Sequence, residues 1–167
     1  MFVKGLKFLD KDFDIEGTII GEVSTFEQKK EFKRIKNLII KLGLEKKITI
    51  IKNIQYKFIN KFYHKNDFFV LPTNHDPAPF SVLEAMSCGC MVLCSSTCGT
   101  KNYINKKING FVFTNNNQES LNRYMLKMVK NKRKFFNNFK KNQLYTSNFL
   151  GRKNFYSFFD MLIKDKR

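Results

Sequence analysis

Short apolar runs alternate along this chain with longer stretches whose apolar residues recur at helical spacing. The predicted strands are residues 17–21, 48–51, 67–71, 91–95 and 110–114. The predicted helices are residues 26–42, 55–64, 80–88 and 118–130. Strands that are apolar on both faces and separated by helices are typical of a parallel sheet covered on both sides. The pattern therefore predicts an α/β, Rossmann-like domain with five or six parallel strands.

The length of the chain suits one domain with a tail. A chain of 167 residues, 43% of them hydrophobic, is long enough and apolar enough for one packed core. We expect residues 1–130 to form the α/β domain and residues 131–167 to form one or two basic helices packed on it. The last of these helices would be built on Phe155, Phe158, Phe159, Leu162 and Ile163.

The chain is strongly basic, with a formal net charge of +17, and much of this charge lies near its end. Residues 123–167 hold 13 Lys and Arg against Asp160 and Asp165, a net charge of +11. Such a tail can meet nucleic acid, an anionic membrane surface or water, and charge alone does not choose among them. Nucleic acid is disfavoured, because Phe135, Phe136 and Phe139 are spaced as core-facing helix positions and not as an exposed stacking platform.

Neither a membrane-spanning segment nor a secretory signal is predicted. No segment reaches the roughly 18 to 20 apolar residues that cross a bilayer. The apolar start of the chain is interrupted by Lys4 and Asp10, so it lacks the apolar core of a signal peptide. We therefore expect a cytoplasmic protein whose basic tail would permit peripheral contact with the inner face of the membrane.

Four cysteines lie close together, at positions 88, 90, 94 and 98. Their spacing is not the paired Cys-x2-Cys form of zinc sites, and they straddle a predicted helix end and a strand. We interpret them as buried free thiols. The alternating carboxylates Asp10, Asp12 and Asp14 precede a predicted strand and are interpreted as a solvated loop. No metal site and no cofactor is predicted.

The loop after the strand at 67–71 is where chemistry is expected, because ligands of open parallel sheets bind at the carboxyl ends of strands. Asp76 lies in this loop, and Glu84 lies about one turn into the next helix, eight residues later. The helix N-terminus between them offers free backbone N–H groups to a phosphate. Carboxylates would repel phosphate, so each is expected to face neutral hydroxyls, as in a sugar. A diphosphate between two hydroxyl-bearing rings describes a nucleotide sugar.

This segment resembles the Glu-x7-Glu motif of the group 1 glycosyltransferases, which include the large retaining family 4. The chain has Val-Leu-Pro-Thr at 70–73, Asp76 and Glu84 at the family's spacing, and Ala-Met-Ser-Cys-Gly at 85–89. Residues 21–22, 42–44, 63–71 and 109–112 resemble further motifs of the family in the same order. The resemblance runs from about Lys4 to the end of the chain. It implies the nucleotide-sugar-binding, C-terminal half of a GT-B fold.

The resemblance also implies a role for each matching residue. Glu84 would bind the ribose hydroxyls, and Asp76 would be the catalytic residue, in contact with the donor sugar. Lys4 would neutralise the diphosphate, while the helix N-terminus holds the distal phosphate and Ile54 lies in the loop that contacts the base. With Glu84, the implied nucleotide-sugar-binding residues are Pro79, Phe80, Ser81, Val82, Lys4, Gly21 and Ile54.

The chain departs from the family pattern at several positions. Asp76 stands where glutamate is usual, Val23 and Cys98 stand where the family has glycine, and Asn102 replaces a glutamate. The family's partner arginine, its first strand and its acceptor-binding N-terminal domain would all lie before residue 1. We therefore expect the chain to be inactive alone and to need a separate N-terminal domain.

The resemblance implies a metal-independent retaining hexosyltransferase, active in polysaccharide biosynthesis. The donor would be a UDP- or GDP-linked sugar, and the acceptor a glycan or a lipid-linked glycan. Two alternatives remain open from the sequence. One is a non-catalytic remnant that keeps the fold, and the other is a basic module that binds a polyanion or a membrane.

Overall fold

A computed structural model describes residues 1–106 and 108–136 of the chain. Its helices are α1 (Phe2–Leu9), α2 (Phe26–Lys41), α3 (Ile59–Lys65), α4 (Phe80–Ser87), α5 (Gln118–Lys130) and α6 (Lys132–Phe136). Its strands are β1 (Gly17–Gly21), β2 (Ile48–Lys52), β3 (Phe68–Leu71), β4 (Met91–Ser95) and β5 (Gly110–Phe113). Two short 3₁₀ turns complete it, η1 (Tyr56–Phe58) and η2 (Gly99–Tyr103). The terminal helices predicted beyond residue 136 lie outside the described residues.

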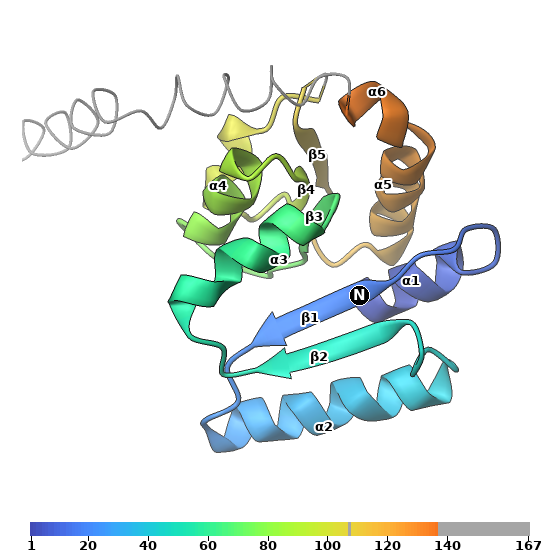
Figure 1. Ribbon diagram of the computed structural model, residues 1–167, viewed down its shortest axis with the longest axis vertical. Coiled ribbons are helices and arrows are strands. Elements are labelled where there is room, and N and C mark those ends of the chain that lie inside the picture. Colours follow the sequence, from blue (N-terminus) through green and yellow to red (C-terminus); the bar gives the residue numbers. More distant parts are fainter. Residues whose placement is uncertain (107, 137–167) are drawn as a thin grey trace, which may run out of the picture.

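All the predicted strands are present and parallel, which confirms the α/β, Rossmann-like class, but they form two sheets. β1 pairs with β2, and β3, β4 and β5 pair in that order. In the described part of the chain no strand ladder joins β1 to β3, although the two sheets lie side by side (Figure 1). An apolar strand pattern specifies burial of both faces but not which strand edges pair. The expected single sheet is therefore replaced by a two-stranded and a three-stranded one.

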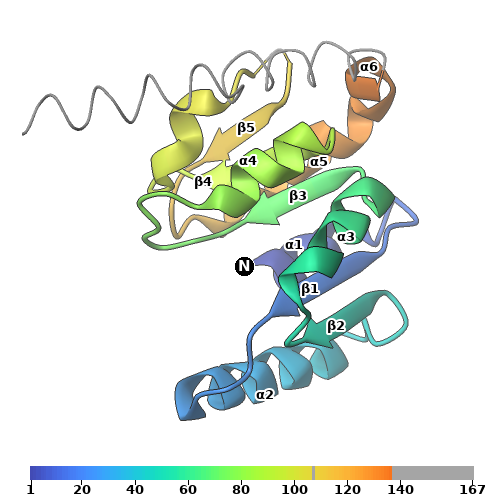
Figure 2. The ribbon, with the colours of Figure 1, turned by 60° about the vertical axis from the view of Figure 1, so that its left-hand side comes forward.

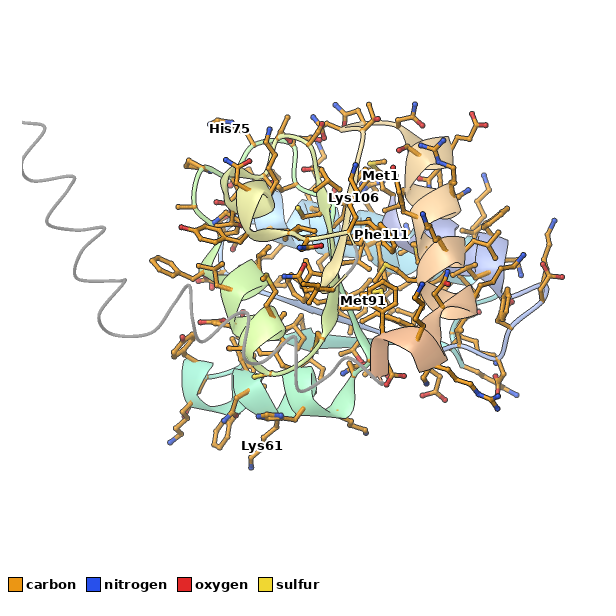
Figure 3. All side chains as sticks on the ribbon, turned by 90° about the horizontal axis from the view of Figure 1, so that it is seen from above. Met1, Lys61, His75, Met91, Lys106 and Phe111 are labelled. Atoms are coloured by element: carbon orange, nitrogen blue, oxygen red, sulfur yellow. The ribbon has the colours of Figure 1, made fainter. Side chains whose placement is uncertain are left out.

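The three-stranded sheet carries helices on opposite faces, as Figure 2 shows for α4 and α5. Alternate residues of a strand point to opposite faces. Leu93 and Phe111 accordingly pack with Leu121 and Met128 of α5 in one apolar cluster. The other face has its own cluster, made by Val92, Cys94, Val112 and the buried residues Val82, Ala85 and Met86 of α4. Figure 3 shows Met91 and Phe111 in the middle of the molecule, and Lys61 and His75 at its edges.

Both sheets share the larger apolar cluster, so the domain has one principal core. Ile39 of α2 and Ile48 of β2 belong to the same buried cluster as Leu93 of β4. Helix α1, which the sequence pattern had not predicted, contributes Val3 and Leu6 to it. The helix lies beside α5 (Figure 1). Gly5 permits this approach, because a Cβ atom there would lie 2.5 Å from Met125 Sδ.

The helix ends follow local sequence signals. Thr25 begins α2 with a capping box, in which its hydroxyl accepts from the Gln28 amide and the Gln28 side chain accepts from the Thr25 amide. Gly43, directly after the last turn of this helix, has a φ of +66°, which glycine adopts without a steric penalty. Gly89 ends α4 in the same way with a φ of +87°. The four cysteines are free thiols, and three of them are buried. Among the described residues, no helix is long and apolar enough to cross a membrane.

Candidate functional site

The loop after β3 is tied to the loop after β4 at the carboxyl ends of these strands. The Ser95 hydroxyl donates to the Thr73 carbonyl oxygen at 2.6 Å, and the Thr97 hydroxyl donates to the same oxygen at 3.1 Å. The Gly99 amide donates to the Asp76 carbonyl oxygen at 2.9 Å, next to an isolated β-bridge between Asp76 and Cys98. The loop that carries Asp76 is therefore held by backbone and hydroxyl hydrogen bonds at both ends.

Helix α4 begins with an open N-terminus. Pro79 occupies the cap position in an extended conformation and supplies no side-chain cap. The Val82 amide donates weakly to the Pro79 carbonyl oxygen at 3.3 Å. Within the described residues, the amides of Phe80 and Ser81 have no protein acceptor. Free amides at the positive end of a helix dipole form an arrangement that suits an anion such as a phosphate.

The packing of the first turn of α4 supports this role. The Val82 side chain is fully buried in the apolar cluster, and Pro79 is also buried. Phe80 points away, with 65% of its surface exposed. The buried side fixes the direction of the helix, and its first two amides are left without a protein acceptor among the described residues.

Asp76 is half-buried at the centre of the loop. Its Oδ1 atom accepts a 3.2 Å hydrogen bond from the Ala78 amide, a local turn that sets the side chain's direction. The carboxylate belongs to a residue four positions before Phe80, which has the first amide of α4. No hydrogen bond joins it to Glu84 in the described part of the chain.

Glu84 sits in the second turn of α4, where two tyrosine hydroxyls bind its carboxylate. The Tyr56 hydroxyl donates to Oε1, and the Tyr63 hydroxyl donates to Oε2 at 3.0 Å. The hydrogen bond to Glu84 raises the pKa of Tyr56, and its negative charge adds to the effect. Burial is the main cause that raises the pKa of Tyr63, and Glu84 raises it further. Glu84 is thus placed to accept hydrogen bonds from hydroxyl groups on both carboxylate oxygens.

Tyr63 and Tyr56 differ in how firmly they are held. The Tyr63 ring meets Phe69 edge to face, with ring centroids 5.7 Å apart. Its carbonyl oxygen accepts from the Cys90 thiol at 3.1 Å. Tyr56 lies on η1 with 73% of its surface exposed. The Tyr63 hydroxyl therefore comes from a packed helix, and the Tyr56 hydroxyl comes from an exposed turn.

Two further predicted residues lie next to the turn that carries Tyr56. Ile54 is half-buried, two residues before Tyr56. Gly21 ends β1, and its carbonyl oxygen accepts from the Asn53 amide at 3.1 Å. The Asn53 side chain accepts in turn from the Val23 amide at 2.7 Å. The loops after β1 and β2 are therefore joined, and Tyr56 connects them to Glu84.

Lys4 makes no hydrogen bond or ion pair with Glu84 or with the loops around it among the described residues. It is exposed on α1, near the α-amino group of Met1 and near Arg34. Burial lowers the pKa of that amine, and the positive charges of Arg34 and Lys4 lower it further. In the described part of the chain, no hydrogen bond or ion pair links Lys4 to the loop of Asp76 or to α4. Among the same residues, no three His, Cys, Asp or Glu side chains are grouped to hold a metal ion.

The tyrosines were missed by sequence reasoning. Tyr56 and Tyr63 precede Glu84 by 28 and 21 residues, a separation that carries no periodic signal. Tyr63 was noted only as part of a stretch that resembles the family. Helix α3, which carries Tyr63, packs against α4, and η1 directly before it carries Tyr56. Both hydroxyls reach Glu84 from this segment.

The parallel sheets with helices on both faces define a class of fold, the one found in GT-B glycosyltransferases. The chain matches the structure of sucrose-phosphate synthase from Thermosynechococcus elongatus with a TM-score of 0.80 and 16% identity, over 98% of this chain and 41% of that one. It matches Anabaena HepE in complex with UDP-glucose with a TM-score of 0.75 and 18% identity, over 87% and 39% of the chains. At these identities the likeness establishes the fold.

The sequence establishes the family. The family model described as "Glycosyl transferases group 1" matches residues 3–144, and the chain belongs to this family. It is also 28% identical over 87 residues to an uncharacterized glycosyltransferase of Methanocaldococcus jannaschii. That match covers 52% of this chain and 22% of the relative. The chain therefore spans about two fifths of the two solved structures and a smaller share of this relative.

Proposed function

We propose that this domain binds the nucleoside diphosphate part of a sugar donor and presents the sugar for transfer. The observation that carries the proposal is the Glu84 carboxylate, which accepts from a hydroxyl group on each of its two oxygens. A ribose presents neighbouring hydroxyls that can donate to the same carboxylate. Hydrogen bonds to a charged acceptor are among the stronger ones, on the order of 1.5–3 kcal/mol each.

The diphosphate would lie at the N-terminus of α4, one turn before Glu84. The free amides of Phe80 and Ser81 and the helix dipole would bind its distal phosphate. The loops with Gly21 and Ile54 would border the base, since Tyr56 joins them to Glu84. We assign Lys4 to diphosphate neutralisation on the family resemblance alone; it would need a change of position relative to α4.

Asp76 would contact the donor sugar, because it lies on the phosphate side of Glu84 in a loop of restrained shape. Charge developing on the leaving diphosphate would be stabilised by amides and cations, with no metal ion required. Retention of configuration, transfer of a hexose and a glycan or lipid-linked acceptor are proposed from the family. The acceptor would be bound by a second domain, consistent with the share of its relatives that this chain spans.

Two findings on other proteins support the proposal. The chain belongs to the group 1 glycosyl transferases, and structures of Anabaena HepE, which shares the fold, contain UDP or UDP-glucose. We therefore propose a UDP- or GDP-linked sugar as the donor.

The test is a calorimetric titration of the chain with UDP, GDP and ADP at low and moderate salt. We expect saturable binding of one nucleotide, and Glu84→Gln should weaken it at least tenfold, because an amide replaces the charged acceptor of two hydroxyls. Glu119→Gln is the matched control, since Glu119 is an exposed residue of the first turn of α5. Equal binding by wild type and Glu84→Gln, or binding that fades with salt as for a polyanion, would refute the proposal.

The role of Asp76 needs a separate measurement. Asp76→Asn should lower the affinity for the nucleotide sugar and leave the affinity for the free nucleotide unchanged. This pattern follows because the side chain would contact the sugar alone. An equal loss for both ligands would mean that Asp76 shapes the loop and has no contact with the donor sugar.

A further inference from the structure

The two tyrosines whose hydroxyls donate to Glu84 are held by the fold with different strength. Tyr63 is half-buried, packs on Phe69 and belongs to α3. Tyr56 is largely exposed, and its ring makes no aromatic contact among the described residues. It belongs to a 3₁₀ turn of three residues with no buried side chain. Tyr56 can therefore leave Glu84 by rotation of its side chain without disturbing the core.

We propose that Tyr56 exchanges with the ligand at Glu84. In the free domain its phenol takes the place of a ribose hydroxyl on Oε1, and the arriving nucleoside displaces it. The released ring then closes over the nucleobase. This inference rests on the proposed function, and it adds a residue that decides affinity for the nucleoside part of the donor.

The exchange is chemically balanced. A carboxylate that has lost a hydroxyl donor in a half-buried position is unsatisfied, so the free domain benefits from a substitute. The phenol and the ribose hydroxyl are both neutral O–H donors, and one replaces the other without a change of charge. Tyr63 continues to donate to Oε2 throughout and keeps the carboxylate in place.

The released ring remains beside the nucleotide. Tyr56 lies two residues from Ile54, and the loop that begins at Asn53 is bonded to Gly21 at the end of β1. An aromatic ring at this point has the flat apolar surface on which a base can stack. Its hydroxyl competes with the ligand, and its ring assists the ligand. The two contributions can be separated by substitution.

The experiment compares wild type, Tyr56→Phe and Tyr56→Ala by calorimetric titration with UDP, GDP and ADP and with ribose 5-phosphate. Tyr56→Phe removes the competing hydroxyl and keeps the ring, so it should bind nucleotide more tightly than wild type, by roughly three- to tenfold. Tyr56→Ala should bind nucleotide more weakly than Tyr56→Phe, again by roughly three- to tenfold, because it lacks the ring. Ribose 5-phosphate has no base and should not distinguish the two variants.

Tyr124→Phe is the matched control. It removes a tyrosine hydroxyl from α5, where the ring stacks on Phe111 away from Glu84. Its nucleotide affinity should equal that of wild type. A spectroscopic titration supplies a second readout, since the contact with Glu84 raises the pKa of Tyr56 and saturating nucleotide should return that pKa toward its ordinary value.

The outcomes separate this inference from the proposed function. Binding that needs Glu84 but is equal in wild type and Tyr56→Phe, or weaker in Tyr56→Phe, would overturn the exchange. Equal affinities of Tyr56→Phe and Tyr56→Ala for the nucleotide would overturn closure over the base. Binding that ignores Glu84→Gln would overturn the proposed function, and the exchange with it.

Discussion

Gly99 and Pro77 approach so closely that a side chain at Gly99 has no room. A Cβ atom at this position would lie 1.7 Å from the Pro77 carbonyl oxygen, and the clash is with backbone. The approach allows the Gly99 amide to donate to the Asp76 carbonyl oxygen at 2.9 Å. The glycine therefore sets the position of the loop that carries Asp76.

Gly99→Ala should destabilise the domain, because the loop and η2 must separate to admit the methyl group. Steric strain of this kind typically costs about 1–3 kcal/mol. Urea denaturation would measure the loss. Gly21→Ala is the control, since a Cβ atom at Gly21 would meet no atom within 4 Å, and its free energy of unfolding should stay close to that of wild type. Equal effects of the two substitutions would contradict this account.

The buried Ser95 hydroxyl should matter for stability more than an exposed one. Ser95→Ala removes the donor of the 2.6 Å bond to the Thr73 carbonyl oxygen and leaves that acceptor partly unsatisfied. We expect a loss of about 1–2 kcal/mol in the free energy of unfolding. Ser87→Ala is the matched control, because the exposed Ser87 hydroxyl bonds a helix carbonyl that water can also reach. A loss at Ser87 as large as that at Ser95 would show that burial is not the cause.

Tyr63→Phe should have the opposite effect to Tyr56→Phe on nucleotide binding. Tyr63 positions the Glu84 carboxylate through its 3.0 Å bond to Oε2, and no ligand group is expected to replace it. Loss of this bond should weaken nucleotide binding by roughly three- to tenfold. The same calorimetric titration measures the direction of the change in nucleotide affinity, which should be weaker for Tyr63→Phe and tighter for Tyr56→Phe. Tighter binding by Tyr63→Phe would mean that Tyr63 also competes with the ligand.

Stability should fall at alkaline pH, because burial raises the pKa of Cys90 to about 12 and also raises the pKa of Cys94. An unfolded thiol loses its proton near pH 9, while the folded one keeps it. The stabilisation is therefore complete below pH 9 and is lost as the pH rises from 9 toward 12. Each thiol with such a raised pKa contributes a slope of up to about 1.4 kcal/mol per pH unit in this window.

Urea denaturation between pH 8 and pH 11 would check this slope. Cys90→Ala should flatten the decline, whatever its effect on stability at neutral pH. Cys88→Ala is the control, because Cys88 is only half-buried and its substitution should flatten the decline less. A decline that is unchanged by Cys90→Ala would show that other groups cause it.

Much of the fold could be predicted from the sequence, because it depends on local periodicity. The strand Met91–Ser95 and the helix Gln118–Lys130 were predicted with the bounds that the structure has. The predicted helix at 55–64 is instead η1 followed by α3, and α1 was not predicted. In α1 the apolar residues Val3, Leu6 and Leu9 do follow helical spacing, but the segment is short and depends on α5 for its packing.

The sequence by itself determined the class of fold, the family and the positions of Asp76 and Glu84 on a loop and helix after β3. These features depend on residues that are close together in the sequence, so the residue pattern alone predicts them. Only the tertiary structure decided how the strands divide into two sheets, that Gly99 fixes the Asp76 loop, and that Tyr56 and Tyr63 meet at Glu84. The contacts of Tyr56, Tyr63 and Gly99 join residues at least 21 positions apart, where spacing carries no information and packing alone brings side chains together.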